Sequence, residues 1–310
     1  MTKRILRIFL ILLIASISTS TYAQETNPLE GRWNLSISYD GKQVPSWLEI
    51  SHSGLSTLVG RFVFLNGSAR PISEIKTKDG KFSFNIPPQW ETGDNLQFQG
   101  DQEGEKLKGT LLYTDGKTYN WNATRAPRLA HNDDPEWGEE KPLFNGKNLD
   151  GWQVMGENQW IVKDGILTSG KSGANLVSDE KFTDFKLHIE FRYPAGSNSG
   201  IFLRGRYEVQ IADNIGLEPS SIYFGGIYGF LTPNEMVAKP AGEWQEYEIT
   251  LIGRRVSIIA NGVPIITDQI IPGMTGGALD NNEAEPGSFM IQGDHGPVEF
   301  RSIVVTPIID

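Results

Sequence analysis

The chain has 310 residues, no cysteine and a formal net charge of −10, and 38% of its residues are hydrophobic. The absence of cysteine excludes disulfides, thiolate zinc sites and cysteine nucleophiles. The net negative charge argues against nucleic acid and anionic membranes as partners, and it favours neutral small molecules, sugars among them.

The first residues predict a secretory signal peptide over residues 1–23. Lys3, Arg4 and Arg7 form a basic start, and the apolar run "IFLILLIASI" that follows is too short to span a bilayer. Ala23 then offers a small residue for cleavage. No second long apolar run follows, so we expect an exported protein, periplasmic or extracellular, without membrane insertion.

Residues 28–127 predict a small antiparallel β-barrel that acts as an accessory domain. Short β-rich runs such as "LVGRFVFL", "KFSFNIP" and "LKGTLLYT" are separated by Gly, Asp, Asn and Pro at the spacing of antiparallel strands. Helical periodicity is nearly absent. Residues 128–141 are polar, acidic and proline-bearing, which is typical of an interdomain linker.

Residues 142–310 return to the β pattern with longer strands, among them "FKLHIEFRYP", "EWQEYEITLIG" and "VEFRSIVVTP". In "IANGVPI", Asn261 and Gly262 stand between two apolar runs and predict a tight hairpin turn. We therefore expect an all-β protein, in which the small barrel precedes a β-sandwich of the jelly-roll type.

The stretch "SGIFLRGRYEVQIAD" carries an unusual set of polar residues among strand formers. Alternate side chains of a strand point to opposite faces. Tyr207, Val209 and Ile211 then share one face. Glu208 and Gln210 share the other, which is either a solvated surface or the floor of an active site.

Further polar residues on or beside strands could share a groove with that face, where carboxylates, amides and guanidinium groups would bind sugar hydroxyls. They are Glu190 in "FKLHIEFR", Tyr228 in "IYGF", and Gln292, His295 and Arg301 in "MIQGDHGPVEFRSI". The ring of Tyr228 is a candidate for stacking on a sugar.

The second half of the chain resembles the 3-keto-disaccharide hydrolase family. The resemblance rests on "LFNGKNLDGW", "NSGIFLRGRYEVQIAD", "KPAGEWQEYEI", "NGVPI" and "IQGDHGPVEFRSIVV", in this order from Leu143 to about Pro307. It implies a concanavalin A-like lectin/glucanase sandwich. It also implies activity on glycosides whose sugar has been oxidised at C3 by a separate dehydrogenase.

A ketone at C3 acidifies the hydrogen at C2, because the carbanion that forms is delocalised as an enolate. A positioned base can remove that proton, and the enolate can then expel the aglycone from C1. Water can add to the product to complete a net hydrolysis. The route needs a base, a donor for the enolate oxygen and an acid for the leaving group.

Strand alternation and this chemistry suggest roles for the polar residues. We expect Glu208 to act as the base, and His295 to act either as an alternative base or as the acid. The remaining predicted roles are enolate stabilisation by Arg204 and Arg301, and orientation of hydroxyls by Gln210, Gln292 and Asp213. Arg204 could instead pair with Asp213, and Glu190 could share the groove or form an ion pair on its rim.

Two other functions stay open at this point. "EVQIAD" partly matches the Glu-x-Asp-x-x-Glu pattern of retaining β-glucanases, although Gln210 and Asp213 replace its second and third acids. A sugar-binding module without catalysis is also compatible, since sandwiches of this kind serve lectins. The oxygen and imidazole groups of Asp213, Asp294, Glu208 and His295 could bind a divalent cation, but no fixed ligand spacing supports one.

Overall fold

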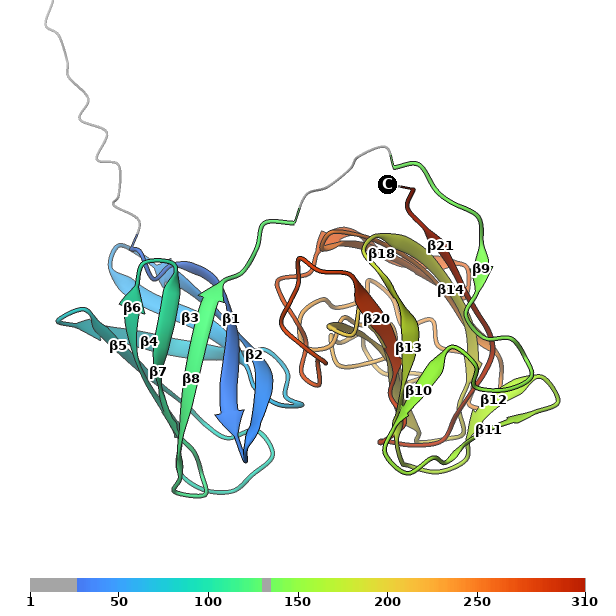
Figure 1. Cartoon of the computed structure of the whole chain (residues 1–310), viewed down its shortest axis with the longest axis horizontal. Coiled ribbons are helices and arrows are strands. Elements are labelled where there is room, and N and C mark those ends of the chain that lie inside the picture. Colours follow the sequence, from blue (N-terminus) through green and yellow to red (C-terminus); the bar gives the residue numbers. More distant parts are fainter. Residues whose placement is uncertain (1–26, 130–134, 310) are drawn as a thin grey trace, which may run out of the picture.

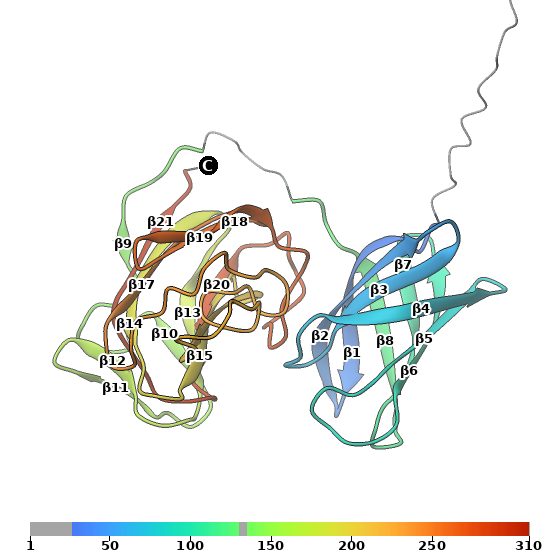
Figure 2. The ribbon, with the colours of Figure 1, turned by 180° about the vertical axis from the view of Figure 1, so that it is seen from behind.

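The computed structural model describes residues 27–129 and 135–309. Every regular element in these residues is a β-strand, which confirms the all-β prediction. Figures 1 and 2 show a barrel and a sandwich side by side. The predicted signal peptide lies outside the described residues, and no helix within them could cross a membrane.

The first part is a closed antiparallel barrel of eight strands, in which each strand pairs with the next and β8 returns to β1. Its interior is filled by apolar and aromatic side chains, including the stacked rings of Phe84 and Phe98, 4.5 Å apart. The strands are β1 (Gly31–Tyr39), β2 (Lys42–Ser53), β3 (Thr57–Val63), β4 (Arg70–Lys78), β5 (Lys81–Ile86), β6 (Leu96–Glu103), β7 (Lys106–Leu112) and β8 (Thr118–Arg125).

The second part is a sandwich of two sheets. The first sheet has five strands in the order β10 (Trp152–Met155), β13 (Asn175–Phe182), β20 (Gly287–Ile291), β15 (Asn198–Leu203) and β16 (Tyr207–Ala212). The second sheet has the order β11 (Trp160–Lys163), β12 (Ile166–Ser169), β21 (Val298–Pro307), β14 (Phe185–Arg192), β17 (Gln245–Ile252), β18 (Arg255–Ala260) and β19 (Val263–Ile270), with β9 (Lys141–Pro142) paired to β21.

One hydrophobic core fills the space between the two sheets. Phe191 of β14 and Tyr247 of β17 are fully buried there, with ring centroids 4.7 Å apart. The predicted hairpin joins β18 to β19, and Asn261 and Gly262 adopt φ angles of 49° and 79°. Both angles are positive, as a type I′ turn requires. The jelly-roll and concanavalin A-like assignments of this sandwich stay predictions.

The predicted linker is only partly separate from the sandwich. Residues 130–134 lie outside the described residues, but the segment that follows runs along the end of β21. Trp137 bridges to Ile308, and the amide of Gly138 donates to the carbonyl of Pro307 at 2.8 Å. The edge of the sandwich therefore begins several residues before 142.

Strand β16 is buried on both faces, in contrast to an ordinary half-buried strand. Its free edge pairs with the long loop between β16 and β17, in which the amide of Gly225 donates to the carbonyl of Gln210 at 2.9 Å. The loop between β19 and β20 also contacts it, since the amide of Thr275 donates to the carbonyl of Arg206 at 2.9 Å. The polar face of this strand is thus enclosed by two loops.

Candidate functional site

Five of the predicted site residues line one small pocket beside the polar face of β16. They are Glu208, Gln210, Tyr228, Gln292 and His295, and Asn66, Asn198, Gly276 and Gly277 complete the lining. The cavity volume is about 40 Å³, which is room for ordered water but well below the roughly 300–1,000 Å³ of whole small-molecule sites.

Glu208 is the buried acid of the pocket. It is 4% exposed, and its carboxylate makes no hydrogen bond to any residue that the structure describes. Burial raises the pKa of this carboxyl well above its ordinary value, and the negative charge of Asp294 raises it further. Such a carboxylate is a stronger base than an exposed one.

Gly200, on the neighbouring strand β15, makes room for that carboxylate. A Cβ atom at residue 200 would overlap Glu208 Oε1 and would approach its Cγ to 2.9 Å. The backbone of Glu208 is held on both sides, because its amide donates to Thr275 Oγ1 and its carbonyl accepts from the amide of Tyr228, each at 3.0 Å. The backbone of Glu208 is therefore held in place by these contacts, while its side chain has no hydrogen-bond partner among the described residues.

Tyr228 is half-buried at the pocket wall. Burial raises the pKa of its hydroxyl, and the charge of Glu208 adds to the effect. The phenol therefore stays protonated at neutral pH and can donate a hydrogen bond to a substrate oxygen.

His295 stands at the turn after β20 and interacts with the side chain before it. Its Nδ1 lies 2.6 Å from Asp294 Oδ1. This hydrogen bond raises the pKa of the imidazole, although partial burial opposes the shift. Asp294 thus favours a protonated His295 and, through its charge, a more basic Glu208, which are the states of an acid and base pair.

The amides of Gln210 and Gln292 present unused acceptors. Gln210 Nε2 donates to Asn198 Oδ1 at 2.9 Å, whereas its Oε1 and that of Gln292 are buried without a partner among the described residues. A buried acceptor without a hydrogen bond is costly and uncommon in folded proteins. Both atoms are therefore suited to accept hydrogen bonds from ligand hydroxyls.

Arg301 and Glu190 do not belong to this pocket, which corrects the prediction that they share a groove with Glu208. They lie on β21 and β14 of the other sheet, where Arg301 donates twice to the Glu190 carboxylate at 2.9 Å. This ion pair lowers the pKa of Glu190. The two strands are neighbours, so the pair is a cross-strand contact on a partly exposed face.

Arg204 and Asp213 also lie outside the pocket lining. Arg204 is 3% exposed, has a φ angle of 54° and directs its guanidinium to the backbone carbonyls of Gly253, Glu283 and Glu285. It therefore holds loops together and does not face an enolate. Asp213 follows the end of β16 and accepts from the amide of Gly196 at 2.9 Å, so the alternative pairing with Arg204 does not occur.

The possible cation ligands named above do not converge. Within the described ranges, 27–129 and 135–309, no group of three or more His, Asp or Glu side chains is arranged to hold a metal ion. The sequence analysis missed Asn66, Asn198 and the backbone of Gly276 and Gly277. Asn198 lies in the motif "NSGIFLRG", but no sequence signal connects Asn66 of the barrel to the second half of the chain.

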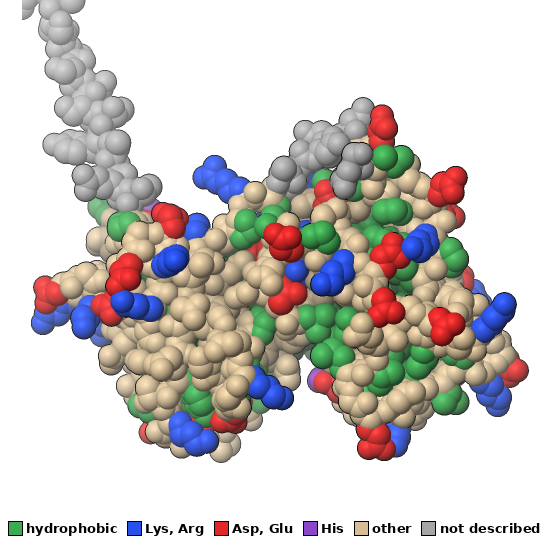
Figure 3. Space-filling model, viewed as in Figure 1, with side chains coloured by type: hydrophobic (Ala, Val, Ile, Leu, Met, Phe, Trp, Pro, Cys, Tyr) green, Lys and Arg blue, Asp and Glu red, His purple; other side chains and the backbone are tan. Residues whose placement is uncertain are grey.

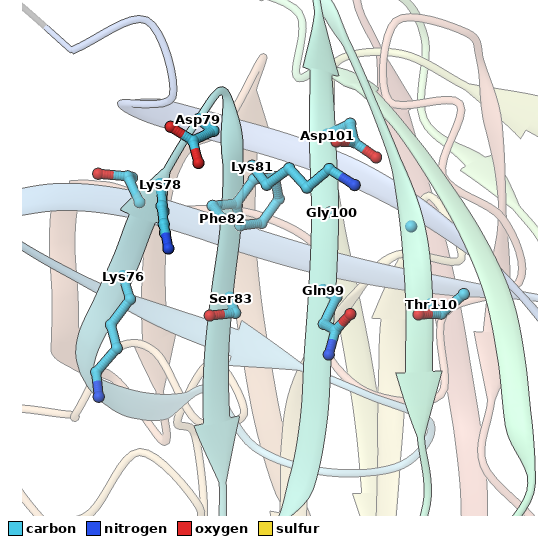
Figure 4. Close-up of a pocket in the computed structure, with 12 residues that line it drawn as sticks. Lys76, Lys78, Asp79, Lys81, Phe82, Ser83, Gln99, Gly100, Asp101 and Thr110 are labelled. Carbon is cyan, nitrogen blue, oxygen red and sulfur yellow. The ribbon is translucent and has the colours of Figure 1, made fainter.

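A second hollow lies on the outer surface of the barrel (Figure 4). Lys76, Lys78 and Lys81 stand around it, and Phe82, Gly100 and Gly109 also line it. All three lysines are exposed, and none of the charged side chains that line it is buried. A site for chemistry needs convergent, partly desolvated groups, so this hollow is the weaker candidate.

Residues 139–306 match the model of one protein family, described as the "3-keto-alpha-glucoside-1,2-lyase-like domain". A curated relative, the 3-keto-disaccharide hydrolase of Bacteroides thetaiotaomicron, is 26% identical over 147 residues. This alignment covers 34% of the chain and 50% of that protein, so the chain spans about half the length of the relative that it matches.

Solved structures also show similarity. A "putative glycosyl hydrolase" from Parabacteroides distasonis is 27% identical, covers 58% of this chain and 93% of its own, and has a TM-score of 0.46. A LamA variant from Z. galactanivorans, in complex with laminaritriose and laminaritetraose, is 10% identical and has a TM-score of 0.37. This similarity covers 57% of this chain and 100% of that one.

Proposed function

The chain belongs to the 3-keto-alpha-glucoside-1,2-lyase-like family, and we propose from this premise that it cleaves glycosides whose sugar carries a ketone at C3. The observation that carries the proposal is Glu208, a buried carboxylate without a hydrogen-bond partner among the described residues and with a raised pKa. It lines a small pocket together with Gln210, Tyr228 and His295 of the matched domain.

In the proposed first step, Glu208 takes the proton from C2 of the sugar. The electron pair of the C2–H bond forms the C2–C3 double bond, and the carbonyl oxygen at C3 becomes an enolate oxygen. A base is most effective when its pKa is close to the pH of the medium, and burial shifts the pKa of Glu208 in that direction. The hydroxyl of Tyr228 is the donor that we assign to the enolate oxygen, in place of Arg204 and Arg301.

In the proposed second step, the enolate electrons return to form a C1–C2 double bond and the C1–O bond to the aglycone breaks. His295, protonated with the help of Asp294, gives its proton to the departing oxygen. Gln210 and Gln292 hold the ring hydroxyls through their unpaired Oε1 atoms. Addition of water across the new double bond turns the elimination into a net hydrolysis.

An ordinary retaining glucanase mechanism is less compatible with this pocket. That mechanism needs two carboxylates about 5–5.5 Å apart across the scissile bond. In this chain the second position of the pattern is Gln210, and the third, Asp213, does not line the pocket and accepts a backbone hydrogen bond. A sugar-binding module without catalysis would not need the raised pKa of Glu208.

The proposal has two consequences for the surroundings of the protein. A separate dehydrogenase must supply the 3-keto glycoside, because the reaction requires a C3 ketone that ordinary glycosides lack. We also propose export, from the basic and then apolar start of the chain.

The test compares an aryl 3-keto-glucoside with the matching unoxidised glucoside, in both anomeric forms, with and without a chelator. We expect the purified protein to release the aryl group from the 3-keto sugar alone. In D₂O, the recovered sugar should carry deuterium at C2. Release from the plain glucoside without deuterium at C2 would replace the proposal by the glucanase mechanism, and binding of both sugars without release would indicate a lectin-like module.

A further inference from the structure

The loop between β3 and β4 of the barrel, residues 64–69, has a fixed shape. Leu65 has a φ angle of 47°, and the amide of Gly67 donates to the carbonyl of Phe64 at 2.9 Å. The side chain of Gln89 also holds the loop. Its Oε1 accepts from the backbone amide of Ser68, and its Nε2 donates to the Ser68 hydroxyl, each at 3.1 Å. The loop is therefore built to hold one conformation.

The tip of this loop touches the backbone of the sandwich directly. The amide of Gly277 donates to the carbonyl of Leu65 at 2.7 Å. A Cβ atom at Gly276 would overlap the carbonyl oxygen of Gly67. A Cβ atom at Gly229, where φ is 73°, would come within 2.7 Å of the Ser68 Cβ. Only glycine allows the two parts to approach so closely at these points.

Apolar and amide contacts hold the two parts together around the loop. Trp47 of β2 packs edge-on against Phe230 of the sandwich, with centroids 5.1 Å apart, and a buried cluster extends this contact to Met274. Asn34 Nδ2 donates to the carbonyl of Asn281 at 3.0 Å, and Asn281 Nδ2 donates to the carbonyl of Leu35 at 2.9 Å. Figure 3 shows the two parts in contact, with a notch open below the contact.

These contacts adjoin two walls of the pocket. Gly276 and Gly277 follow Thr275, whose hydroxyl accepts from the amide of Glu208. Gly229 follows Tyr228, which lines the pocket itself. The barrel therefore supports the segments on either side of the buried carboxylate.

Asn66, at the tip of the loop, lines the pocket together with the sandwich residues. Its side chain is exposed and makes no hydrogen bond to the described residues, and its Oδ1 would lie 3.7 Å from a Cβ at Gly277. The buried Oε1 atom of Gln210, in the same pocket, also lacks a partner among the described residues. The pocket thus offers unpaired amide groups from both parts of the molecule.

We propose that Asn66 is a substrate-binding residue and that the barrel forms one wall of the sugar site. An amide both donates and accepts, so it matches a sugar hydroxyl, which does the same. The identity of the sugar rests on the function proposed above, but the assignment of Asn66 rests on the placement of the loop. On this proposal the barrel is part of the binding site and not a separate accessory domain.

The first experiment compares Asn66→Ala with Asn85→Ala, a matched substitution at an exposed position of β5. Loss of a hydrogen bond to a bound hydroxyl should raise KM for the 3-keto-glucoside about 5- to 10-fold, with a smaller change in kcat. Asn85→Ala should change neither. An unchanged KM in Asn66→Ala would overturn the proposal.

The second experiment does not need turnover. The chain has no cysteine, so a thiol introduced by Asn66→Cys in the full-length Glu208→Gln protein is the only target for a maleimide. We expect saturating 3-keto-glucoside to slow its alkylation at least about 5-fold, and to leave alkylation of Asn85→Cys unchanged.

The outcomes separate this proposal from the proposed function. If the wild-type protein cleaves no 3-keto-glucoside but the plain glucoside protects the thiol introduced by Asn66→Cys, the reaction is wrong and the site assignment holds. If cleavage occurs but neither sugar protects that thiol, the assignment of Asn66 is wrong and the reaction holds.

Discussion

Strands β14 and β16 carry glutamates in similar patterns, "FKLHIEFR" and "YEVQIAD", but the two carboxylates have opposite environments. Glu190 of β14 is partly exposed, accepts two hydrogen bonds from Arg301 and has a lowered pKa. Glu208 of β16 is buried, unpaired within the described part of the chain and has a raised pKa. Alternation places both side chains correctly on the polar side of their strands.

The difference comes from what covers each strand. Loops pair with the edge of β16 and enclose its polar face. On β14, by contrast, Glu190 forms an ion pair with Arg301 of the neighbouring strand β21, on a partly exposed surface. Burial without a partner makes a carboxylate basic, and a neighbouring guanidinium makes it acidic. The chemistry of each glutamate thus depends on segments far from it in the sequence.

The largest expected effect contrasts the two glutamates directly. Glu208→Gln should lower kcat/KM for a 3-keto-glucoside about 10³-fold, because it removes the proposed base for the C2 proton. Glu190→Gln is the matched control and should stay within about twofold of wild type, since a surface ion pair contributes little. Initial rates of aglycone release measure both, and equal losses in the two variants would contradict the distinction.

A smaller effect concerns the pH profile. The proposed mechanism needs an ionised Glu208 and a protonated His295, so the raised pKa of each should move the acidic and basic limbs of kcat/KM to higher pH than ordinary side chains would give. Asp294→Asn removes the charge that raises both values, so both limbs should move to lower pH. On the alkaline side of the optimum, we expect kcat/KM of Asp294→Asn to be roughly 10-fold below that of the wild type.

Profiles of kcat/KM against pH for wild type, Asp294→Asn and the barrel variant Asp101→Asn test this prediction. The barrel variant should reproduce the wild-type profile. A profile of Asp294→Asn that loses height without moving along the pH axis would mean that Asp294 does not control these groups.

The smallest effect is on stability, and it has opposite signs for the two glutamates. Below the unfolded pKa of about 4.3, Glu208 is protonated in both the folded and the unfolded state. As the pH rises above this value, the carboxyl ionises in the unfolded state but stays protonated in the folded state. The free energy of unfolding therefore falls until the pH passes the raised folded pKa. Glu208→Gln should therefore increase the free energy of unfolding at pH 7 by about 0.5–2 kcal/mol, a gain that disappears near pH 4.

Glu190 has a lowered folded pKa, so its ion pair stabilises the fold above about pH 4.3, and the contribution disappears as the pH falls through the folded value. Glu190→Gln should decrease the free energy of unfolding at pH 7 by at most about 1 kcal/mol. Urea denaturation at pH 4 and pH 7 measures both changes. A less stable Glu208→Gln at pH 7 would show that the carboxylate has a stabilising partner.

Much of the fold could be predicted from local pattern. The two-residue period of "FKLHIEFR" gave β14, and Asn261 with Gly262 gave the β18–β19 turn, because both depend on neighbours in the sequence. The end of the linker was harder to predict. Trp137 and Gly138 belong to a mostly polar segment, but they pair with Ile308 and Pro307 at the far end of the chain.

The pocket could be predicted only in part. Glu208 and Gln210 follow from strand alternation, and His295 follows from its place among the polar residues of "MIQGDHGPVEFRSI". Arg301 could not be placed, because which sheet a strand joins depends on long-range pairing. Arg204 was misassigned because its positive φ turns the side chain toward carbonyl groups of a distant loop.

Gly229, Gly273 and Gly276 have a consequence for how proteins with this domain diversify. At each of these positions the barrel occupies the space that a side chain would fill, Trp47 doing so at Gly273. A domain that stands alone has no such reason to keep glycine there. Glycine at these three positions of the matched domain is thus explained by the adjacent barrel. A fragment containing only residues 139–306 would keep the three glycines without the barrel that requires them.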